Sequence, residues 1–221
     1  MKFSFEYFFT VIPGLVKKIP VTLLLGVLSF MIALLLGVIL ALIQKSKYKT
    51  LKKIVTTYVS FFRSTPYITQ LFILYFGLPQ LIPALKVITA AQALVISLAM
   101  NSSAFISEII RGAIMSVDKG QMEAGISVNM SKMDIYRRII FPQALISAIP
   151  ALGNAFVNII KGTSMGFTIG VVELLSQAKI GALNSFKFLE SYMAVGLVYW
   201  LLVIVMDYLQ KKLENYVGRY L

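Results

Sequence analysis

A run of 23 residues without a formal charge, from Val21 to Ile43, limits the folds open to this chain more than any other feature. As an α-helix, which rises about 1.5 Å per residue, such a run reaches about 34 Å and can cross a bilayer with some tilt. The rest of the chain agrees, because 58% of its 221 residues are hydrophobic and its mean hydropathy is +0.83. A soluble core of this size is less apolar. The sequence therefore predicts an integral membrane protein.

Four further segments are apolar enough to follow the first as membrane helices. They are Ile54–Leu78, Val87–Ile110, Gln143–Ile160 and Tyr192–Met206. Ile54–Leu78 is interrupted by Arg63 and Pro66, and Gln143–Ile160 contains Pro150, breaks that also occur in buried irregular segments. We expect an all-α integral membrane fold of about five transmembrane helices, in one domain over residues 1–221. Residues 1–18 are expected to be an interfacial lead-in rather than a cleaved signal, since Glu6 and Pro13 interrupt the signal pattern.

The distribution of positive charge predicts the orientation. Residues 44–53 carry five lysines and no acid, residues 111–142 carry five basic residues, and the tail from Asp207 carries three. Because Lys and Arg concentrate in cytoplasmic loops, these segments should face the cytoplasm. The N-terminus is then outside and the C-terminus inside, which requires an odd number of spans.

Composition also excludes several kinds of function. The chain has no Cys and no His, so it offers no disulfide, no thiolate or imidazole catalyst and no typical zinc or haem site; we expect no metal site. The net charge of +12 would suggest nucleic acid in a soluble protein, but in a membrane protein it indicates anionic lipid, so the bilayer and not nucleic acid is the expected partner.

Residues 117–142 form the largest predicted cytoplasmic segment and include EAGISVNMSKMDIYRRIIFP, from Glu123. Two capping patterns, at Asp118 and at Ser131, predict two short helices with Asn129 between them. Pro142 is expected to end the second helix. Gly125 next to Ala124 would let another protein approach the backbone closely. An amphipathic helix-turn-helix lying on the inner leaflet is the alternative.

This segment resembles the cytoplasmic motif of ATP-binding-cassette importer permeases, in which Glu-Ala-Ala is followed by a glycine and then by Ile-x-Leu-Pro. Glu123, Ala124, Ile139 and Pro142 match the motif, whereas Gly125, Asn129 and Phe141 depart from it. Three more stretches are similar to the polar amino acid uptake subfamily, in the same order. They are FFRSTPYITQLFILYFGLP from Phe61, SSAFISEIIRGAIMSVDKGQMEA from Ser102 and KGTSMGFTIGVVELL from Lys161.

The resemblance implies a permease subunit of an ATP-driven importer in the bacterial plasma (inner) membrane, which moves polar amino acids inward by alternating access. The residues implied in coupling to the ATPase are Glu123, Ala124, Gly125, Ile126 and Asn129. The implied partners are an ATP-binding-cassette ATPase dimer, a second permease copy, identical or closely related, and an extracellular solute-binding protein. The chain lacks GxxxxGK[ST], so it is not expected to be an enzyme or to bind a cofactor; Mg-ATP belongs to the partner ATPase.

The resemblance also implies a substrate path. Its residues are Asn101, Ser102, Ser103, Lys161, Thr163, Ser164 and Met165. An outer loop with a solvated lysine is the alternative for Lys161. No acid accompanies that motif, and the nearest carboxylate is Glu173, which favours neutral polar or acidic amino acids, cystine included, over cationic ones. Glu108 and Arg111 are three residues apart and predict a structural charge pair, and Arg63 is interpreted as a structural residue.

Two other classes of membrane protein are alternatives to an importer permease. In a secondary transporter, Glu108 would be a proton-coupling carboxylate, but neither inverted repeats nor additional spans are visible in the sequence. In a channel or membrane scaffold, the broken helices would line a pore. Neither class accounts for the segment at Glu123–Gly125.

Overall fold

The computed structural model describes residues 3–218 and is helical throughout, with no strand in that range. Its α-helices are α1 Phe5–Val16, α2 Ile19–Gln44, α3 Lys49–Ser64, α4 Tyr67–Phe72, α5 Leu78–Leu81, α6 Ala90–Ser116, α7 Lys119–Ser127, α8 Lys132–Ile135, α9 Phe141–Gly162, α10 Leu174–Ser185 and α11 Phe188–Val217. Two π-helical turns, Ile73–Gly77 and Tyr136–Ile140, and two 3-10 helices, Pro83–Val87 and Thr163–Ile169, connect some of them. The predicted all-α class is confirmed.

Within residues 3–218, four helical stretches are long and apolar enough to cross a membrane. They are α2, α6, α11 and the stretch Lys132–Ile169 that contains α9. The predicted second span is not one helix: α3 ends at Ser64, Thr65 is extended (φ −108°, ψ 146°), and α4 starts after Pro66. Pro66 disfavours a helical conformation for the residue before it, which explains the break. The count of five spans therefore stays a prediction.

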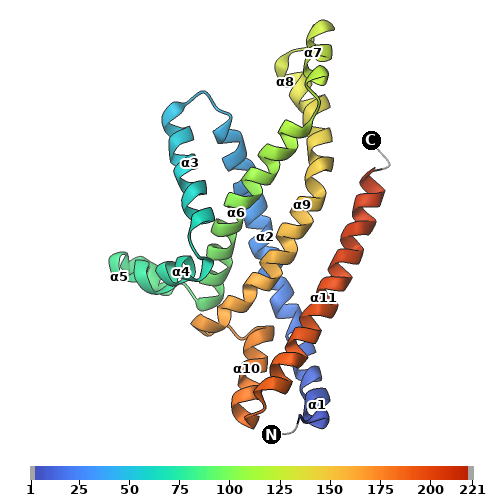
Figure 1. Cartoon of the computed structure of the whole chain (residues 1–221). Helices are drawn as coiled ribbons and strands as arrows, with labels where there is room; N and C mark the ends of the chain where they lie inside the picture. The colour runs from blue at the N-terminus through green and yellow to red at the C-terminus, as the bar shows by residue number, and fades with distance from the viewer. Residues whose placement is uncertain (1–2, 219–221) are drawn as a thin grey trace.

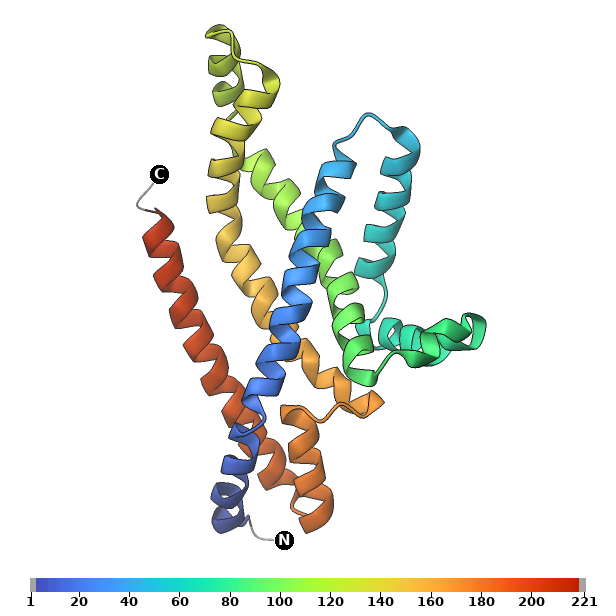
Figure 2. The ribbon, with the colours of Figure 1, turned by 180° about the vertical axis from the view of Figure 1, so that it is seen from behind.

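The central contact of the fold is between α2 and α6, which lie side by side in both ribbon views (Figures 1 and 2). Small side chains fill this contact, with Ala33 and Ala99 almost fully buried. At Gly37, an added Cβ would lie 2.6 Å from Cγ2 of Ile106, so only glycine fits there. Small residues of this kind let membrane helices approach closely and gain van der Waals contact.

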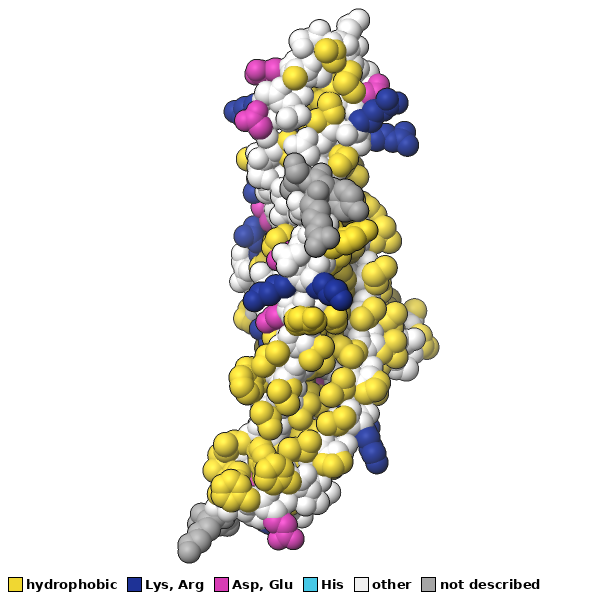
Figure 3. Space-filling model, turned by 90° about the vertical axis from the view of Figure 1, so that its right-hand side faces the viewer, with side chains coloured by type: hydrophobic (Ala, Val, Ile, Leu, Met, Phe, Trp, Pro, Cys, Tyr) yellow, Lys and Arg dark blue, Asp and Glu magenta, His cyan; other side chains and the backbone are white. Residues whose placement is uncertain are grey.

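The two ends of the molecule carry different segments. The helices α7 and α8, the α2–α3 connection and the last turns of α11 lie toward one end, whereas α1 and α10 lie at the other (Figure 1). Figure 3 shows that hydrophobic side chains dominate the middle and lower part of the face it presents, while most charged side chains gather toward the α7 end. The three segments predicted to be cytoplasmic thus share one end.

Two prolines that were expected to break helices do not end them. The helix α9 runs through Pro150, whose carbonyl accepts a hydrogen bond from Nε2 of Gln210 in α11 (3.1 Å). Pro142 is the second residue of α9, and α9 directly follows the π-helical turn Tyr136–Ile140, so α8 continues into α9. A proline inside a helix removes one backbone N–H, and a local π-helical turn is one of the adjustments that allow a membrane helix to continue past it. The expectation that Pro142 ends the helix was wrong.

The N-terminal helix α1 packs against α10 and α11. Leu15 is fully buried in this contact, Tyr7 donates its hydroxyl to the carbonyl of Gly181 (3.0 Å), and the Ser4 amide donates to Oε1 of Glu190 (2.9 Å). Its position at the membrane surface stays a prediction.

Candidate functional site

The helices α7 and α8 form a compact tip at one end of the molecule. Asp118 caps α7 by accepting a hydrogen bond from the Gly120 amide (2.7 Å), and Ser131 caps α8 by accepting one from the Asp134 amide (3.2 Å). Asn129 turns the chain between them in the left-handed region (φ 63°), a conformation that asparagine tolerates.

Gly125 serves the contact between α7 and α8 themselves. It is buried, and an added Cβ would lie 2.6 Å from Cγ1 of Ile135, while its carbonyl accepts a hydrogen bond from the Met130 amide (3.0 Å). Gly125 therefore does not leave open space in which another protein could approach the backbone, as predicted, because the chain's own Ile135 occupies that space.

The outer surface of the tip is partly apolar. Ile126, Val128 and Met133 are each more than half exposed, and Glu123 and Ala124 are exposed beside them. An exposed apolar patch outside the membrane belt is typical of a surface that docks another protein.

A second feature is a cleft of about 490 Å³ between α6, α9 and α4, which we call the amide cleft. Asn101 and Ser102 of α6 face Asn154 and Asn158 of α9 across it, and Gly162 and Tyr67 line it as well. No charged side chain is among its lining residues, so it presents neutral hydrogen-bonding groups between two helical stretches that are long and apolar enough to cross a membrane.

Of the predicted substrate-path residues, Asn101 and Ser102 line the amide cleft and the others do not. Ser103 points away from it, is fully buried and shares a hydrogen bond with the Tyr58 hydroxyl (3.0 Å). Thr163 is fully buried and donates to the Ile160 carbonyl (2.7 Å). Lys161 and Met165 are exposed and Ser164 is half-buried; in the chain they lie on either side of Gly162, which lines the cleft.

Sequence reasoning missed Asn154 and Asn158. They are four residues apart and both exposed, and Lys161 follows three residues later, so all three share one face of α9. This polar spacing within an apolar helix was the available signal.

Asn101 also has a structural task. Its Nδ2 donates to the Phe62 carbonyl (3.0 Å) and to Oε1 of Gln70 (2.9 Å), while Gln70 Nε2 donates to the carbonyls of Phe62 and Thr65 (3.1 Å each). These amides satisfy carbonyls that the break at Pro66 leaves without helical partners. Only the side-chain oxygen of Asn101 remains for the cleft.

The nearest carboxylate to the Lys161–Met165 segment is not available to a ligand. Glu173 is fully buried; Oε1 accepts from the Ser176 amide (2.8 Å), and Oε2 accepts from the Leu175 amide and the Tyr199 hydroxyl (2.9 Å each). Glu173 thus caps α10 and ties it to α11.

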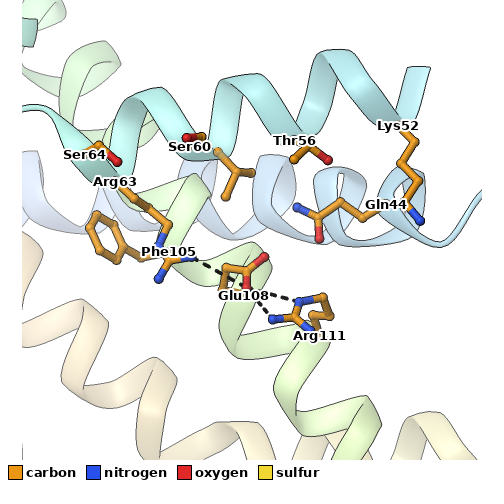
Figure 4. A pocket seen from close by; sticks show the side chains of 10 residues that line it. Gln44, Lys52, Thr56, Ser60, Arg63, Ser64, Phe105, Glu108 and Arg111 are labelled. Carbon is orange, nitrogen blue, oxygen red and sulfur yellow. Dashed lines mark hydrogen bonds and ion pairs between the residues drawn. The ribbon is translucent and has the colours of Figure 1, made fainter. Parts of the chain in front are cut away.

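A second cleft, of about 600 Å³, lies between α3, α6 and the end of α2, and we call it the arginine cleft. Arg111 Nη2 lies 2.6 Å from Oε2 of Glu108, so the predicted charge pair is present as a contact, and Nη1 of Arg63 lies 3.6 Å from the same oxygen (Figure 4). The spacing rule found the pair within α6 but could not find Arg63, which comes from α3.

No group of three or more metal-binding side chains occurs among residues 3–218.

Comparison with known proteins places the whole chain in one group. Residues 33–219 match the family described as binding-protein-dependent transport system inner membrane component. The probable amino-acid permease protein YxeN of Bacillus subtilis (strain 168) is 43% identical over 96% of this chain and 95% of that protein. The L-cystine transport system permease protein TcyL of the same organism is 35% identical over 92% of this chain and 87% of that protein.

A solved structure described as an amino acid ABC transporter with histidines matches with a TM-score of 0.91 and 33% identity, over 98% of this chain and 100% of that one.

Proposed function

The chain belongs to the family of binding-protein-dependent transport system inner membrane components, and from this premise we propose that it moves a polar amino acid inward through the amide cleft. It is a membrane permease subunit of an ABC importer and is not itself the ATPase, which is a separate subunit. Amino-acid transport appears in the names of its relatives, and the amide cleft offers the hydrogen-bonding groups that such a substrate needs.

The proposed coupling between the ATPase and this chain rests on the structure of the tip formed by α7 and α8. Its exposed apolar side chains, Ile126, Val128 and Met133, lie on α7, α8 and the turn between them, at one end of the molecule (Figure 1). The helix α8 continues through the π-helical turn into α9, which lines the amide cleft. A movement imposed on α8 by a docked ATPase would therefore reach the cleft through one continuous helix. We expect two permease copies, an ATPase dimer and an external solute-binding protein in the assembly.

For the membrane, we propose five crossings with the N-terminus outside and the C-terminus inside. The basic segments at the α2–α3 connection and around α7–α8 support this orientation, because both lie toward the same end of the molecule (Figure 1). The second crossing would be made by α3 together with the segment after Pro66.

For the substrate, we favour a neutral polar or acidic amino acid, cystine included. The amide cleft has no carboxylate in its lining, and Glu173 is buried and engaged by three donors. A cationic side chain would leave its charge unpaired in such a site. An uptake competition in which lysine or arginine displaced every neutral amino acid would rule this preference out.

The test is ATP-driven amino acid uptake in proteoliposomes that contain this chain with its candidate ATPase and solute-binding protein. Glu123→Arg should abolish uptake and co-purification of the ATPase, because it reverses the charge beside the exposed apolar patch. Lys86→Glu, a charge reversal on an exposed residue away from the tip, should leave both intact. Uptake that followed a proton gradient without ATP and ignored Glu123 would overturn the proposal.

A further inference from the structure

The arginine cleft has a wall of polar side chains along one face of α3. Lys52, Thr56, Ser60 and Arg63 all line it, and their spacing of four, four and three residues places them on the same side of the helix. Lys52 and Arg63 are therefore separated by about 16 Å along the axis. The cleft runs from the α2–α3 connection toward the middle of the molecule, and Figure 4 shows Arg63 of α3 directed at Glu108 of α6.

Three hydroxyl side chains of α3 line the arginine cleft. Thr56, Ser60 and Ser64 make no hydrogen bond to any residue from 3 to 218. By contrast, Thr65 donates to the Phe61 carbonyl and Ser107 of α6 donates to the Ala104 carbonyl (2.8 Å each), as hydroxyls in apolar helices commonly do. The unpaired hydroxyls leave donors directed at the cleft, where water or a ligand can accept from them.

Positive charge in the arginine cleft exceeds negative charge. Lys52, Arg63 and Arg111 line it with a single carboxylate, Glu108, and both arginines contact the same oxygen of that carboxylate. Lys52 makes no ion pair with any residue that the structure describes. The guanidinium of Arg63 also lies over the Phe105 ring, 5.8 Å from its centre, which helps to orient it.

The positive charge of the arginine cleft also affects the pKa of a neighbouring lysine, Lys45. Partial burial, and secondly the positive charge of Arg111, lower the pKa of the Lys45 ammonium, which lies just outside α2. An anion placed in the arginine cleft would relieve this repulsion.

From these observations we propose that the arginine cleft binds an oxyanion, a carboxylate or a phosphate, between Lys52, Arg63 and Arg111, with the hydroxyls of α3 donating to it. A volume of about 600 Å³ accommodates a small molecule or a lipid headgroup. Guanidinium groups bind carboxylate and phosphate through paired N–H donors, which suits either anion. With the orientation given under the proposed function, the arginine cleft opens toward the cytoplasm. Binding of an oxyanion does not depend on that orientation.

The test measures how fast phenylglyoxal modifies each arginine in the full-length chain, held in phosphatidylcholine nanodiscs without ATP. Inorganic phosphate and glutamate are the free probes, and phosphatidylglycerol nanodiscs without added anion are the lipid arm. Mass spectrometry reads each arginine separately. Arg63 and Arg111 should be protected, whereas Arg137 and Arg138, which are exposed near the tip, serve as internal controls and should not be.

Two substitutions should act in opposite directions on the anion concentration that gives half protection. Lys52→Gln removes a cation and should raise that concentration about five- to tenfold, whereas Glu108→Gln removes the competing carboxylate and should lower it by a similar factor. A variant that merely misfolds would not tighten binding, so the opposite signs separate a binding role from a structural one.

Protection by phosphate or glutamate assigns the site to a soluble anion, and protection in the lipid arm alone assigns it to a headgroup; both support the oxyanion site. No protection in either arm, equal protection of Arg137 and Arg138, or no response to both substitutions would overturn it. Because labelling needs neither ATP nor partners, a failure of ATP-driven uptake would leave this result standing, and the reverse also holds.

Discussion

At the scale of single residues, several of this chain's unusual side chains are explained by close neighbours within the chain. Gly125 makes room for Ile135, Asn129 adopts a left-handed turn, and Gln70 satisfies carbonyls at the break before Pro66. Each of these positions tolerates few other residues, for reasons of space, backbone conformation or hydrogen bonding.

Gly125→Ala should loosen the tip. The added Cβ would lie 2.6 Å from Cγ1 and 2.8 Å from Cδ1 of Ile135, and overpacking of this kind costs about 1–3 kcal/mol. Hydrogen exchange of the Met130 amide, which donates to the Gly125 carbonyl, should become about tenfold faster or more. Adding Ile135→Val should restore part of the protection.

The matched control for Gly125 is Gly112→Ala, because no atom lies within 4 Å of a Cβ added at Gly112. It should leave exchange at Met130 unchanged. Equal effects of the two substitutions would contradict the packing explanation.

Gln70→Leu should destabilise the junction of α3 and α4. It keeps the side chain's approximate size but leaves the Thr65 carbonyl and one N–H of Asn101 without this partner in a buried place, and it removes one of the two donors to the Phe62 carbonyl. We expect a loss of about 1–3 kcal/mol in the free energy of unfolding, seen as a lower melting temperature of the purified protein in detergent. The exposed Gln80→Leu should change it little; a drop as large there would argue against the hydrogen-bond account.

At the scale of elements, a proline does not by itself decide whether a helix ends. The helix α9 continues through Pro150 beside Gln210 of α11, whereas α3 stops before Pro66. The missing N–H of Pro150 frees the carbonyl of Ile146, four residues earlier, whereas Gln210 donates to the carbonyl of Pro150 itself, so this contact does not replace the lost bond. Sequence alone therefore does not distinguish a proline that kinks a helix from one that ends it.

The helix α10 depends on Glu173 at its first turn. Glu173→Gln should weaken this cap, because the amide replaces one acceptor oxygen with a donor that faces the Leu175 amide and Tyr199 or the Ser176 amide. We expect a loss of about 1–3 kcal/mol in the free energy of unfolding, and a smaller one, about 1 kcal/mol, for Tyr199→Phe.

Thermal unfolding of the single and double variants tests this cap, since two residues that share a hydrogen bond should give a combined loss smaller than the sum. The exposed Glu6→Gln is the control and should have no measurable effect. Fully additive losses would mean that Glu173 and Tyr199 act independently.

At the scale of the whole molecule, the two polar clefts and the tip formed by α7 and α8 lie along a single apolar bundle. The amide cleft and the arginine cleft share Phe105 of α6 in their linings, so both open along the same helix. The tip joins the amide cleft through α8 and α9.

The proposed orientation can be tested with single cysteines, because the chain has none of its own. Lys86→Cys and Lys179→Cys should react with a membrane-impermeant maleimide in intact cells, since both positions are placed outside. Lys47→Cys and Lys212→Cys should react only after permeabilisation. All four positions are exposed, so a reversed or mixed pattern would reflect the topology and would refute five crossings with the N-terminus outside.

Much of the fold could be predicted from sequence because its signals are local. Apolar segments located α2, α6, α9 and α11, capping residues located α7 and α8, and a three-residue spacing located the Glu108–Arg111 pair. Helix length, helix caps and neighbours on one helix face all depend on residues a few positions apart.

The tertiary structure alone decided which faces meet. It placed Arg63 of α3 beside Glu108 of α6, set Asn154 and Asn158 of α9 across from Asn101, turned Ser103 away from the cleft and filled the space at Gly125 with Ile135. These contacts join residues distant in the chain, and their partners depend on helix rotation and packing. Apolar faces in a membrane are nearly interchangeable, so close fit and hydrogen bonding between helices, rather than hydrophobic pattern, select the arrangement.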